Sequence, residues 1–571
     1  MGEKLRVGIL CDGLELEQWQ AECVRLVLAV DGVEPVVLVL YEKPARKASS
    51  FVQRVLHHPW HMAFYLWWRK NRFKPAALSK VDVSDRLAQV PRVACKPVDQ
   101  GTDLPFEPDD LRAIAHYRPD VLLSFGSNIL KGEILTLPRY GVWSYHHGDE
   151  EKYRGQPPGF WEIMDGAPVT GAVLQRLTEK QDGGFILAKG WFRTIDHSLS
   201  ASIDAVLMGS AGWAAQVCRA LVEDKSDAAN GRPSTTNAAI KKYPGNIDFI
   251  NFLITLHGNK RRSFQRLSSQ RLERNFGVLY LPISSLLDAR PNLNVRWLPA
   301  PSEGQSRSAP FGYMADGQLN VLYEKFDHAT GKGEISRLRP KRDNILKRSR
   351  TMLTSIGHYS HPFVLQKDDT VNVVPECGAN DRVELYRVNE ANDSLELQGT
   401  LLNERLSSPT LFEHNGLWWI MGTKPPLDDV ALYAYYASSM EGPYSPHAMQ
   451  PLKMDIRSAR PAGTPFKHEG ALYRPAADVS KTDGRRVSIM RVTELTPTTF
   501  REEWVKNIGP LKGSVWNAGL HTISAVGEQT LVECERSVQT ISRTKRSSKA
   551  KKSGKREKLA KPDDDEEDDQ E

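Results

Sequence analysis

Two residues with acid/base chemistry follow predicted strands in the first third of the chain. A strand predicted over 142–145 delivers His146 at its end, and another over 171–177 leads to Asp182 and a glycine pair. Ligands bind at the carboxyl ends of strands in open α/β sheets, so His146 is expected at a binding edge. A histidine and an aspartate on adjacent strand ends form a plausible acid/base pair.

The elements that must position these residues alternate along residues 1–223. Strand-like apolar runs at 5–10, 33–41 and 119–126 are separated by helical patterns such as that at 17–30. Strand, helix and strand in succession predict a parallel sheet covered by helices. We therefore expect an N-terminal α/β domain with a Rossmann-like parallel sheet.

The chain changes character after residue 223. Residues 224–246 are rich in Ser, Thr, Asn, Gly and Pro without apolar periodicity, which predicts a linker. Residues 247–275 begin apolar and turn basic, which predicts a helical connector whose arginines either face solvent or touch RNA.

Residues 276–543 carry short β-rich runs between Gly, Asp and Asn turns. Such spacing predicts an all-β fold, either a sandwich or a propeller, and the recurring unit of polar residue, glycine and aromatic strand favours the propeller. Residues 544–571 form a lysine-rich block and then an acidic block, which predicts a disordered tail.

Composition limits the class of protein. The 571 residues carry a net charge of +6, and no apolar run approaches the ~18 residues of a membrane span. The six cysteines form no CxxC pair, so we expect neither zinc nor disulfides and place the chain in the cytoplasm. Pro59 interrupts the cluster of His57, His58 and His61, and no metal site is expected there.

Four short motifs in order resemble one family. They are Ser144-Tyr145-His146, Tyr153-Arg154-Gly155, residues 166–171 (GAPVTG) and Asp182-Gly183-Gly184. This pattern resembles the N-terminal domain of formyltransferases that use 10-formyltetrahydrofolate, such as methionyl-tRNA formyltransferase and the sugar N-formyltransferases.

The resemblance implies a role for each matching residue. His146 would donate to the developing oxyanion and Asp182 would accept the proton of the attacking amine. Ser144 stands where the family has asparagine and would be a weaker donor, and His147 would be a bystander. The folate would lie along the loop of Phe125, Gly126, Ser127, Asn128 and Ile129, and the substrate would contact Arg154 and Gly155.

The second half has a resemblance of its own. Segments such as GHYSHPFVLQ and DIRSARPAGTPFKHEGALYRPAADVS resemble the propeller associated with glucosamine inositolphosphorylceramide transferases. More distantly they are similar to five-bladed arabinanase-type glycosidases, which use central carboxylates. Ala309 and Ser408 replace acids of that pattern, which makes hydrolysis doubtful and leaves sugar binding. The residues expected to bind substrate there are Glu376, Asp455, Arg457, Arg460 and Asp478.

These observations predict a folate-dependent N-formyltransferase acting on an amino sugar or glycoconjugate, with a five-bladed propeller that recognises glycan. One alternative is methionyl-tRNA formylation, although no compact basic domain follows the first domain, so nucleic acid is not the expected partner. The other is a non-catalytic carbohydrate-binding protein in which His146 and Asp182 are remnants. Fold alone does not choose among them.

Overall fold

The computed structural model describes residues 4–41, 60–95, 103–104, 106–126, 129–179, 183–223, 226–340, 349–354, 357–481 and 484–539. Four of the features expected from sequence lie outside these ranges, namely Ser127, Asn128, Asp182 and the tail over 544–571.

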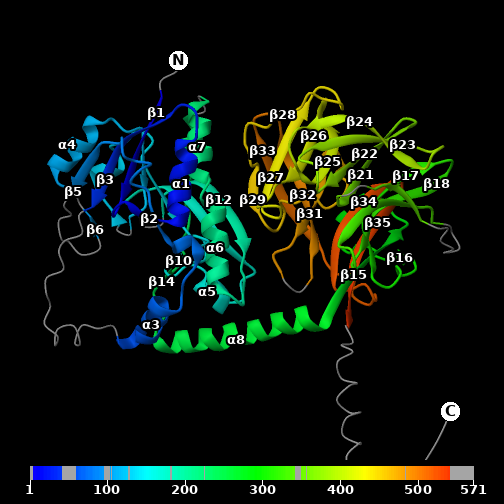
Figure 1. The fold of residues 1–571 in the computed structure, drawn as a ribbon, viewed down its shortest axis with the longest axis horizontal. Helices are drawn as coiled ribbons and strands as arrows, with labels where there is room; N and C mark the ends of the chain where they lie inside the picture. Colours follow the sequence, from blue (N-terminus) through cyan, green and yellow to red (C-terminus); the bar gives the residue numbers. More distant parts are fainter. Residues whose placement is uncertain are drawn as a thin grey trace, which may run out of the picture.

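Five parallel strands form the first part of the fold, in the order β5–β3–β1–β7–β9 (Figure 1). Their bounds are β1 Leu5–Cys11, β3 Val33–Tyr41, β5 Arg92–Cys95, β7 Val121–Ser124 and β9 Val142–His146. All four residues of β7 are buried, as in strands covered on both faces. Two antiparallel strands, β11 (Val169–Arg176) and β12 (Phe185–Arg193), extend the sheet beyond β9. The α/β sheet expected for residues 1–223 is therefore confirmed, as a mixed sheet.

Helices cover both faces of this sheet. On one face, α1 (Gln18–Leu28), α6 (Leu199–Ser210) and α7 (Trp213–Val222) share a hydrophobic core with β7 and β9. On the other, Ile114 of α4 (Pro108–His116) packs against Leu10 and Leu122. In the described part of the chain, only the stretch Leu199–Val222 is long and apolar enough to cross a membrane, and half of its apolar window is buried in the fold.

Four self-contained sheets of four antiparallel strands follow. The first comprises β15 (Gln270–Leu279), β16 (Arg296–Trp297), β34 (Gly519–Val526) and β35 (Gln529–Gln539). The second comprises β17 (Gln305–Ala315), β18 (Gln318–Asp327), β19 (Lys332–Leu338) and β20 (Arg350–Leu353). The third comprises β21 (Tyr359–Lys367), β22 (Thr370–Cys377), β23 (Val383–Asn389) and β24 (Ser394–Leu402). The fourth comprises β30 (Phe466–His468), β31 (Ala471–Asp478), β32 (Arg486–Leu495) and β33 (Phe500–Ile508).

The expectation of a five-bladed propeller requires correction, because the described residues form four such separate sheets. The remaining antiparallel strands are β25 (Ser407–His414), β26 (Leu417–Thr423) and β27 (Ala431–Ala437). A short strand, β29 (Lys453–Asp455), pairs with β27 on one side and with β12 on the other. These strands therefore belong to one 13-stranded sheet that runs from the propeller-like half into the α/β half.

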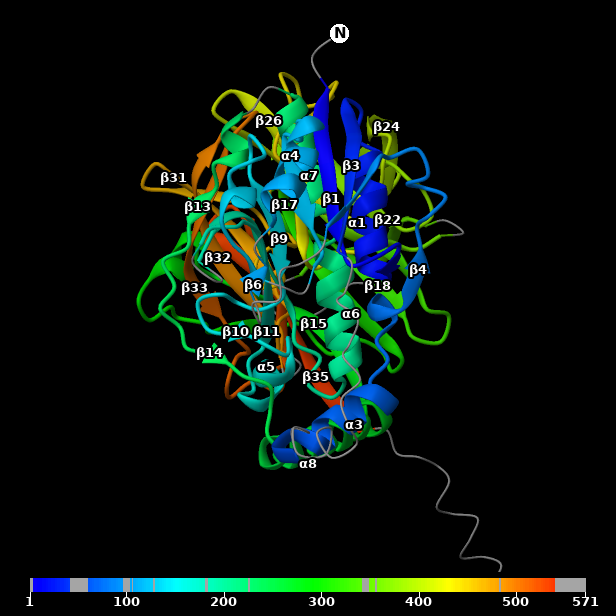
Figure 2. The ribbon, with the colours of Figure 1, turned by 90° about the vertical axis from the view of Figure 1, so that its left-hand side faces the viewer.

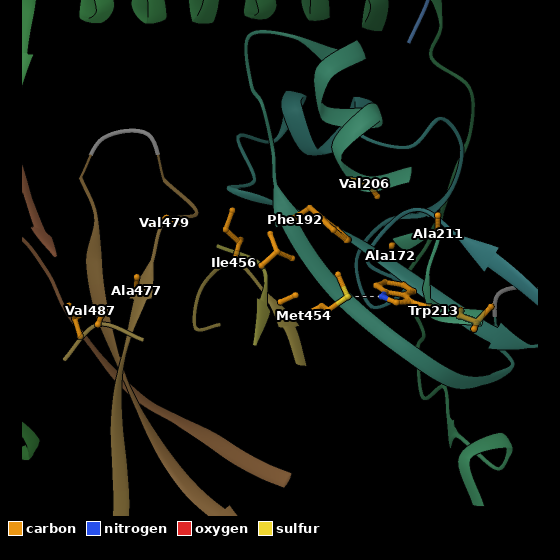
Figure 3. Close-up of a cluster of buried hydrophobic side chains, with 14 of the residues drawn as sticks. Ala172, Phe192, Val206, Ala211, Trp213, Met454, Ile456, Ala477, Val479 and Val487 are labelled. Carbon is orange, nitrogen blue, oxygen red and sulfur yellow. Dashed lines mark hydrogen bonds between the residues drawn. The ribbon is translucent and has the colours of Figure 1, made fainter. Parts of the chain in front are cut away.

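A shared core reinforces this junction (Figure 3). The indole Nε1 of Trp213 in α7 donates to Sδ of Met454 in β29 at 2.7 Å. A Cβ atom on Gly190 of β12 would lie 2.9 Å from the Trp213 ring and 3.0 Å from Met454, so the close approach of β12 and β29 requires glycine there. The two halves are thus joined by backbone pairing as well as by apolar packing.

Two connecting segments are also ordered. Residues of the expected linker pair with the first half, since β13 (Arg232–Pro233) joins β12 and β14 (Ile240–Lys241) joins β10 (Arg154–Gly155). The expected connector is the long helix α8 (Asn246–Ser269), which continues into β15. It runs along one end of the molecule beside α3 (Ala63–Asn71) (Figures 1 and 2).

Candidate functional site

The expected site residues begin at neighbouring strand ends. Ser124 at the end of β7 is in register with Ser144 of β9, so the loop of Phe125 and Gly126 lies at the same sheet edge as His146. Side chains alternate along a strand, which places Ser144 and His146 on one face of β9. The structure therefore brings three expected elements together, whereas Asp182 lies outside the described residues.

The imidazole of His146 is buried and engaged by the loop that follows it. Its Nε2 lies 3.1 Å from the carbonyl oxygen of Tyr153, and because a carbonyl only accepts, Nε2 is the donor. A Cβ atom on Gly148 would lie 2.6 Å from that oxygen and 2.9 Å from Nε2. Glycine at 148 therefore lets the loop close directly over His146.

An acidic turn in the same loop surrounds one buried lysine. Nζ of Lys189, from β12, lies 3.1 Å from Asp149 Oδ1, 3.0 Å from Glu150 Oε2 and 3.7 Å from Glu151 Oε1. The linker also holds this turn, since Thr236 Oγ1 donates to the Glu150 carbonyl at 2.6 Å. The turn is therefore held from two sides, by the ion pairs with Lys189 of β12 and by the hydrogen bond from Thr236 of the linker.

A small pocket lies beside this turn, partly open to solvent. Its lining residues are His147, Tyr153, Arg154, Gly155, Pro157, Pro158, Trp161, Glu162 and Lys241. The expected substrate residues Arg154 and Gly155 thus line a pocket. Arg154 Nη1 also donates to the Ala238 carbonyl at 3.0 Å, which ties the pocket wall to the linker.

Glu162 is the titratable group of this pocket that sequence reasoning missed. It lies on the buried face of α5 (Phe160–Met164), and its Oε1 has no hydrogen-bond partner among the described residues. Burial raises the pKa of Glu162 to about 7, backbone donors oppose the rise, and the charges of Asp149 and Asp165 add to it. A carboxyl poised near neutrality is suited to proton transfer. Its sequence signal was an acid placed among apolar residues of a helical segment.

His147 is partly buried and stays neutral. Burial lowers its pKa to about 3, with a further contribution from His146. Its ring stacks on Tyr145 with centroids 5.8 Å apart, and Ser210 Oγ lies 3.3 Å from its Nε2. Although His147 lines the pocket, its contacts with Tyr145 and Ser210 indicate a structural role.

Two of the expected propeller residues lie at the junction with the α/β half. Arg457 donates to both carboxylate oxygens of Asp455 at 2.8 Å, and its guanidinium lies 4.5 Å from the ring centroid of Trp191 in β12. Lys189 Nζ lies 4.9 Å from the same ring centroid. Trp191 thus links the acidic turn to the Asp455–Arg457 pair.

The other expected propeller residues are divided. Glu376 Oε2 accepts from the Ser408 backbone at 2.8 Å and lies 3.6 Å from Arg460 Nη2, while Arg460 Nε donates to Ser408 Oγ at 2.9 Å. Asp478 instead accepts from the Ser480 hydroxyl at 2.6 Å. The structure therefore brings Glu376 and Arg460 together and places Asp478 near Arg457, with whose charge it interacts.

The Glu376–Arg460 pair belongs to a buried cluster built on a repeated bulge. Ala309, His361 and Ser408 each precede a proline and have φ of 47°, 45° and 53° at register shifts of β17, β21 and β25. Those strands contact one another in the order β17, β21, β25. The repeat thus presents equivalent positions of three sheets to a common centre.

Carboxyl groups of other strands accompany this bulge. The Ala309 backbone donates to Glu533 Oε2 at 2.9 Å. Burial raises the pKa of Glu324 to about 8; Arg274 opposes the rise, and the charges of Glu533 and Glu376 add to it. The centre therefore combines buried acids with arginines, a set able to hydrogen-bond a polyhydroxylated ligand. In the described residues, no group of three His, Cys, Asp or Glu could hold a metal ion; His57 and His58 lie outside them.

Comparison with known proteins gives two kinds of similarity. Residues 300–519 match the family described as glucosamine inositolphosphorylceramide transferase 1, N-terminal. The protein of that name from Oryza sativa subsp. japonica is 29% identical over 205 residues, which are 34% of this chain and 27% of the relative.

The second kind of similarity is to formyltransferases. Methionyl-tRNA formyltransferase of Clostridium perfringens (strain 13 / Type A) is 30% identical over 118 residues, which are 20% of this chain and 38% of the relative. The bifunctional polymyxin resistance protein ArnA of Wigglesworthia glossinidia brevipalpis is 33% identical over 91 residues, 16% of this chain and 14% of the relative. The chain thus resembles both groups and spans well under half the length of each of these relatives.

Proposed function

We propose that the chain is an N-formyltransferase that uses 10-formyltetrahydrofolate and acts on an amino sugar or glycoconjugate. The observation that carries the proposal is the placement of Ser144 and His146 on one face of β9, at the edge shared with the Phe125–Gly126 loop. The similarity to formyltransferases supports the reaction class. The similarity to the inositolphosphorylceramide transferase supports a glycoconjugate acceptor.

The residues beside the loop fit a folate. The buried hydroxyl of Tyr41 has no hydrogen-bond partner among the described residues, and its ring approaches to 3.7 Å the position of a Cβ on Gly126. An unsatisfied buried donor suits a ligand with a hydrogen-bonding ring edge. We propose that Phe125, Gly126 and the residues through Ile129 hold the cofactor, with its pterin along the loop. When bound, the cofactor supplies an activated formyl group.

Residues of the chain would orient the reactants and accept the proton of the attacking amine. His146 Nε2–H would donate to the oxygen that gains charge, once it exchanges its bond to the Tyr153 carbonyl for that oxygen. Ser144 would add a weaker donor. Glu162 would accept the proton of the amine alongside the sequence-predicted Asp182, because burial holds the pKa of Glu162 near 7. The linker residues over 232–241 would limit water access.

The charge of the site favours an amine acceptor. Nζ of Lys189 lies against the three carboxylates over 149–151, and Asp149 also interacts with the charge of Arg457. We propose that the amine of the acceptor approaches these carboxylates. The Asp455–Arg457 pair lies across Trp191 from this turn and would contact the sugar part of the acceptor. We further propose that Glu376 and Arg460 bind glycan at the centre of the propeller-like half.

A second candidate function is a non-catalytic carbohydrate-binding protein. It is favoured because the polar groups of the site already have partners within the chain: the Tyr153 carbonyl accepts from His146, and Lys189 pairs with Asp149 and Glu150. Under this alternative the propeller centre binds sugar and the α/β half is a scaffold. In either case we propose a cytoplasmic setting, since all six cysteines are free thiols.

Calorimetry of the full chain with 10-formyltetrahydrofolate separates the two candidates. If the chain is a formyltransferase, the folate should bind saturably. Gly126→Trp should abolish this binding, because the indole would occupy the space proposed for the folate beside the Phe125–Gly126 loop. The control is His468→Ala, a partly exposed histidine of β30 in the propeller-like half, which should bind like the wild type. Absence of binding at millimolar folate, together with retained sugar binding, favours the non-catalytic candidate.

A further inference from the structure

Helix α3 exposes an aromatic stripe. Phe64 and Trp67 lie three residues apart, which places them on one side of the helix, and Trp60 lies in the 3-10 turn Trp60–Met62 just before α3. All three are more than half exposed, Trp67 at 61%. Clustered exposed aromatics of this size mark interaction surfaces, unlike scattered single ones.

Helix α8 exposes a matching aliphatic stripe. Ile247, Ile250 and Ile254 recur at intervals of three and four residues, and Ile247 and Ile254 are 76% and 66% exposed. The opposite side of α8 packs inward, where Phe249 and Phe252 are buried. The helix is therefore apolar on both sides, and its buried side alone accounts for the packing of the fold.

The two helices are fixed to each other at the start of α8. Asn246, at the start of α8, accepts from the Phe64 backbone at 3.0 Å and donates to the Trp60 carbonyl at 2.7 Å. Behind the surface, the rings of Trp68 and Phe249 lie 5.4 Å apart. Both helices lie at the same end of the molecule (Figures 1 and 2). We call Phe64, Trp67, Ile247, Ile250 and Ile254 the end surface.

Lysines and arginines follow the exposed apolar residues in both helical segments. Residues 60–74 and 246–266 contain eight lysines and arginines and one acid. The cations are Arg69, Lys70, Arg72, Lys74, Lys260, Arg261, Arg262 and Arg266. The acid, Asp248, accepts from the Gly245 backbone at 3.0 Å within the turn that starts α8. The charge of this end is thus complementary to an anionic partner.

We propose that the end surface docks on the face of a membrane rich in anionic lipid. Interfacial helices combine an apolar side with flanking Lys and Arg, and tryptophan concentrates at the headgroup level. The stripe of three isoleucines distinguishes this surface from an RNA site, which uses stacking aromatics and arginines. The basic rim distinguishes it from an ordinary apolar protein interface, whose centre is depleted in charge.

The docked orientation would bring the candidate pocket near the lipid surface. Phe160 of α5 stacks on Phe252 of α8 with centroids 4.3 Å apart, and α5 carries Glu162 of the pocket. An acceptor attached to lipid could therefore be presented to the pocket. The docking surface itself does not depend on the proposed formyl transfer, so either can fail without the other.

Co-sedimentation of the full chain with large unilamellar vesicles tests the proposal. Vesicles of phosphatidylcholine with about a third phosphatidylserine should bind the chain at least about tenfold more tightly than phosphatidylcholine alone, and salt should weaken the binding. Trp67→Glu with Ile254→Glu should reduce binding about tenfold or more, and Lys70→Glu with Arg261→Glu should do the same. These side chains are exposed, so unfolding midpoints should be unchanged.

The matched control is Trp504→Glu, since Trp504 lies on β33 of the propeller-like half and is also 61% exposed. It should bind anionic vesicles like the wild type. Equal loss in Trp504→Glu and in the end-surface variant overturns the assignment of the site. Absence of binding to anionic vesicles overturns the proposal, whether single-stranded RNA binds instead or the chain self-associates through the end surface.

Discussion

Replacing Lys189 by methionine tests how the acidic turn is held. The substitution keeps an unbranched apolar chain and removes the cation that lies 3.1 Å from Asp149 Oδ1 and 3.0 Å from Glu150 Oε2. Lys189 and Glu150 are almost wholly buried and Asp149 nearly so, whereas Glu151 is largely exposed. The variant therefore leaves two buried carboxylates without their cation.

The expected cost follows from that burial. Removing one partner of a buried ion pair destabilises a protein by about 3–5 kcal/mol, because the remaining charge is uncompensated. The exposed Glu151 adds little, since solvent screens its charge. Urea denaturation of the full chain near pH 7, followed by tryptophan fluorescence, measures the loss.

Lys325→Met is the matched control. Its Nζ lies 3.0 Å from Glu334 Oε1, but the two side chains are 32% and 28% exposed, so the expected loss is at most about 1 kcal/mol. Adding Asp149→Asn and Glu150→Gln to Lys189→Met should recover much of the stability. Equal losses in the two single variants would refute the reasoning that burial makes the Lys189 cluster costly to break.

Three further predictions concern the pocket, the junction and the donor beside His146. The pKa of Glu162 is raised from 4.5 to about 7, so the wild type should lose up to about 3 kcal/mol of stability as the pH rises from 4.5 to 7. Urea melts of Glu162→Gln should not show this loss. The same pH dependence in the variant and the wild type would contradict the raised pKa of Glu162. Gly190→Ala should cost about 1–3 kcal/mol by overpacking Trp213 and Met454, whereas Gly399→Ala, with no atom within 4 Å of the added Cβ, should be near neutral. Ser144→Asn should preserve or raise formyl transfer to an amino-sugar nucleotide and Ser144→Ala should lower it modestly, while a large loss in Ser144→Asn would remove serine from the donor role.

The α/β sheet could be predicted from sequence because its strands are buried on both faces. Runs such as VVLVLY at 36–41 are continuous apolar stretches, and such strands show a clear signal without any tertiary information. His146 could likewise be placed at a strand end. The sequence gives no comparable signal for the pairing of β29 with β12. This pairing joins a three-residue strand to a strand far away in the sequence, and it depends on the close approach at Gly190.

The candidate site was harder to predict because its partners come from elsewhere in the chain. In the sequence, Glu162 looks like a surface acid, and only the packing of α5 against the loop over 148–155 shows that it lines the pocket. Likewise, the role of Lys189 is apparent only from its ion pair with the acidic turn. The segment over 224–246 has a linker's composition, yet Thr236 bonds to Glu150. Such contacts are set by tertiary packing, which short-range patterns do not encode.

The most direct test of the central claim is formyl transfer by the full chain. The chain is incubated with 10-formyltetrahydrofolate and an amino-sugar nucleotide such as a 4-amino-4-deoxyhexose nucleotide, and the formylated product is measured by mass spectrometry. We expect transfer by the wild type and by His468→Ala, and a loss of about 10²–10⁴ in His146→Ala. An unchanged rate in His146→Ala would contradict the mechanism, and absence of any transfer while folate binds would contradict the choice of acceptor.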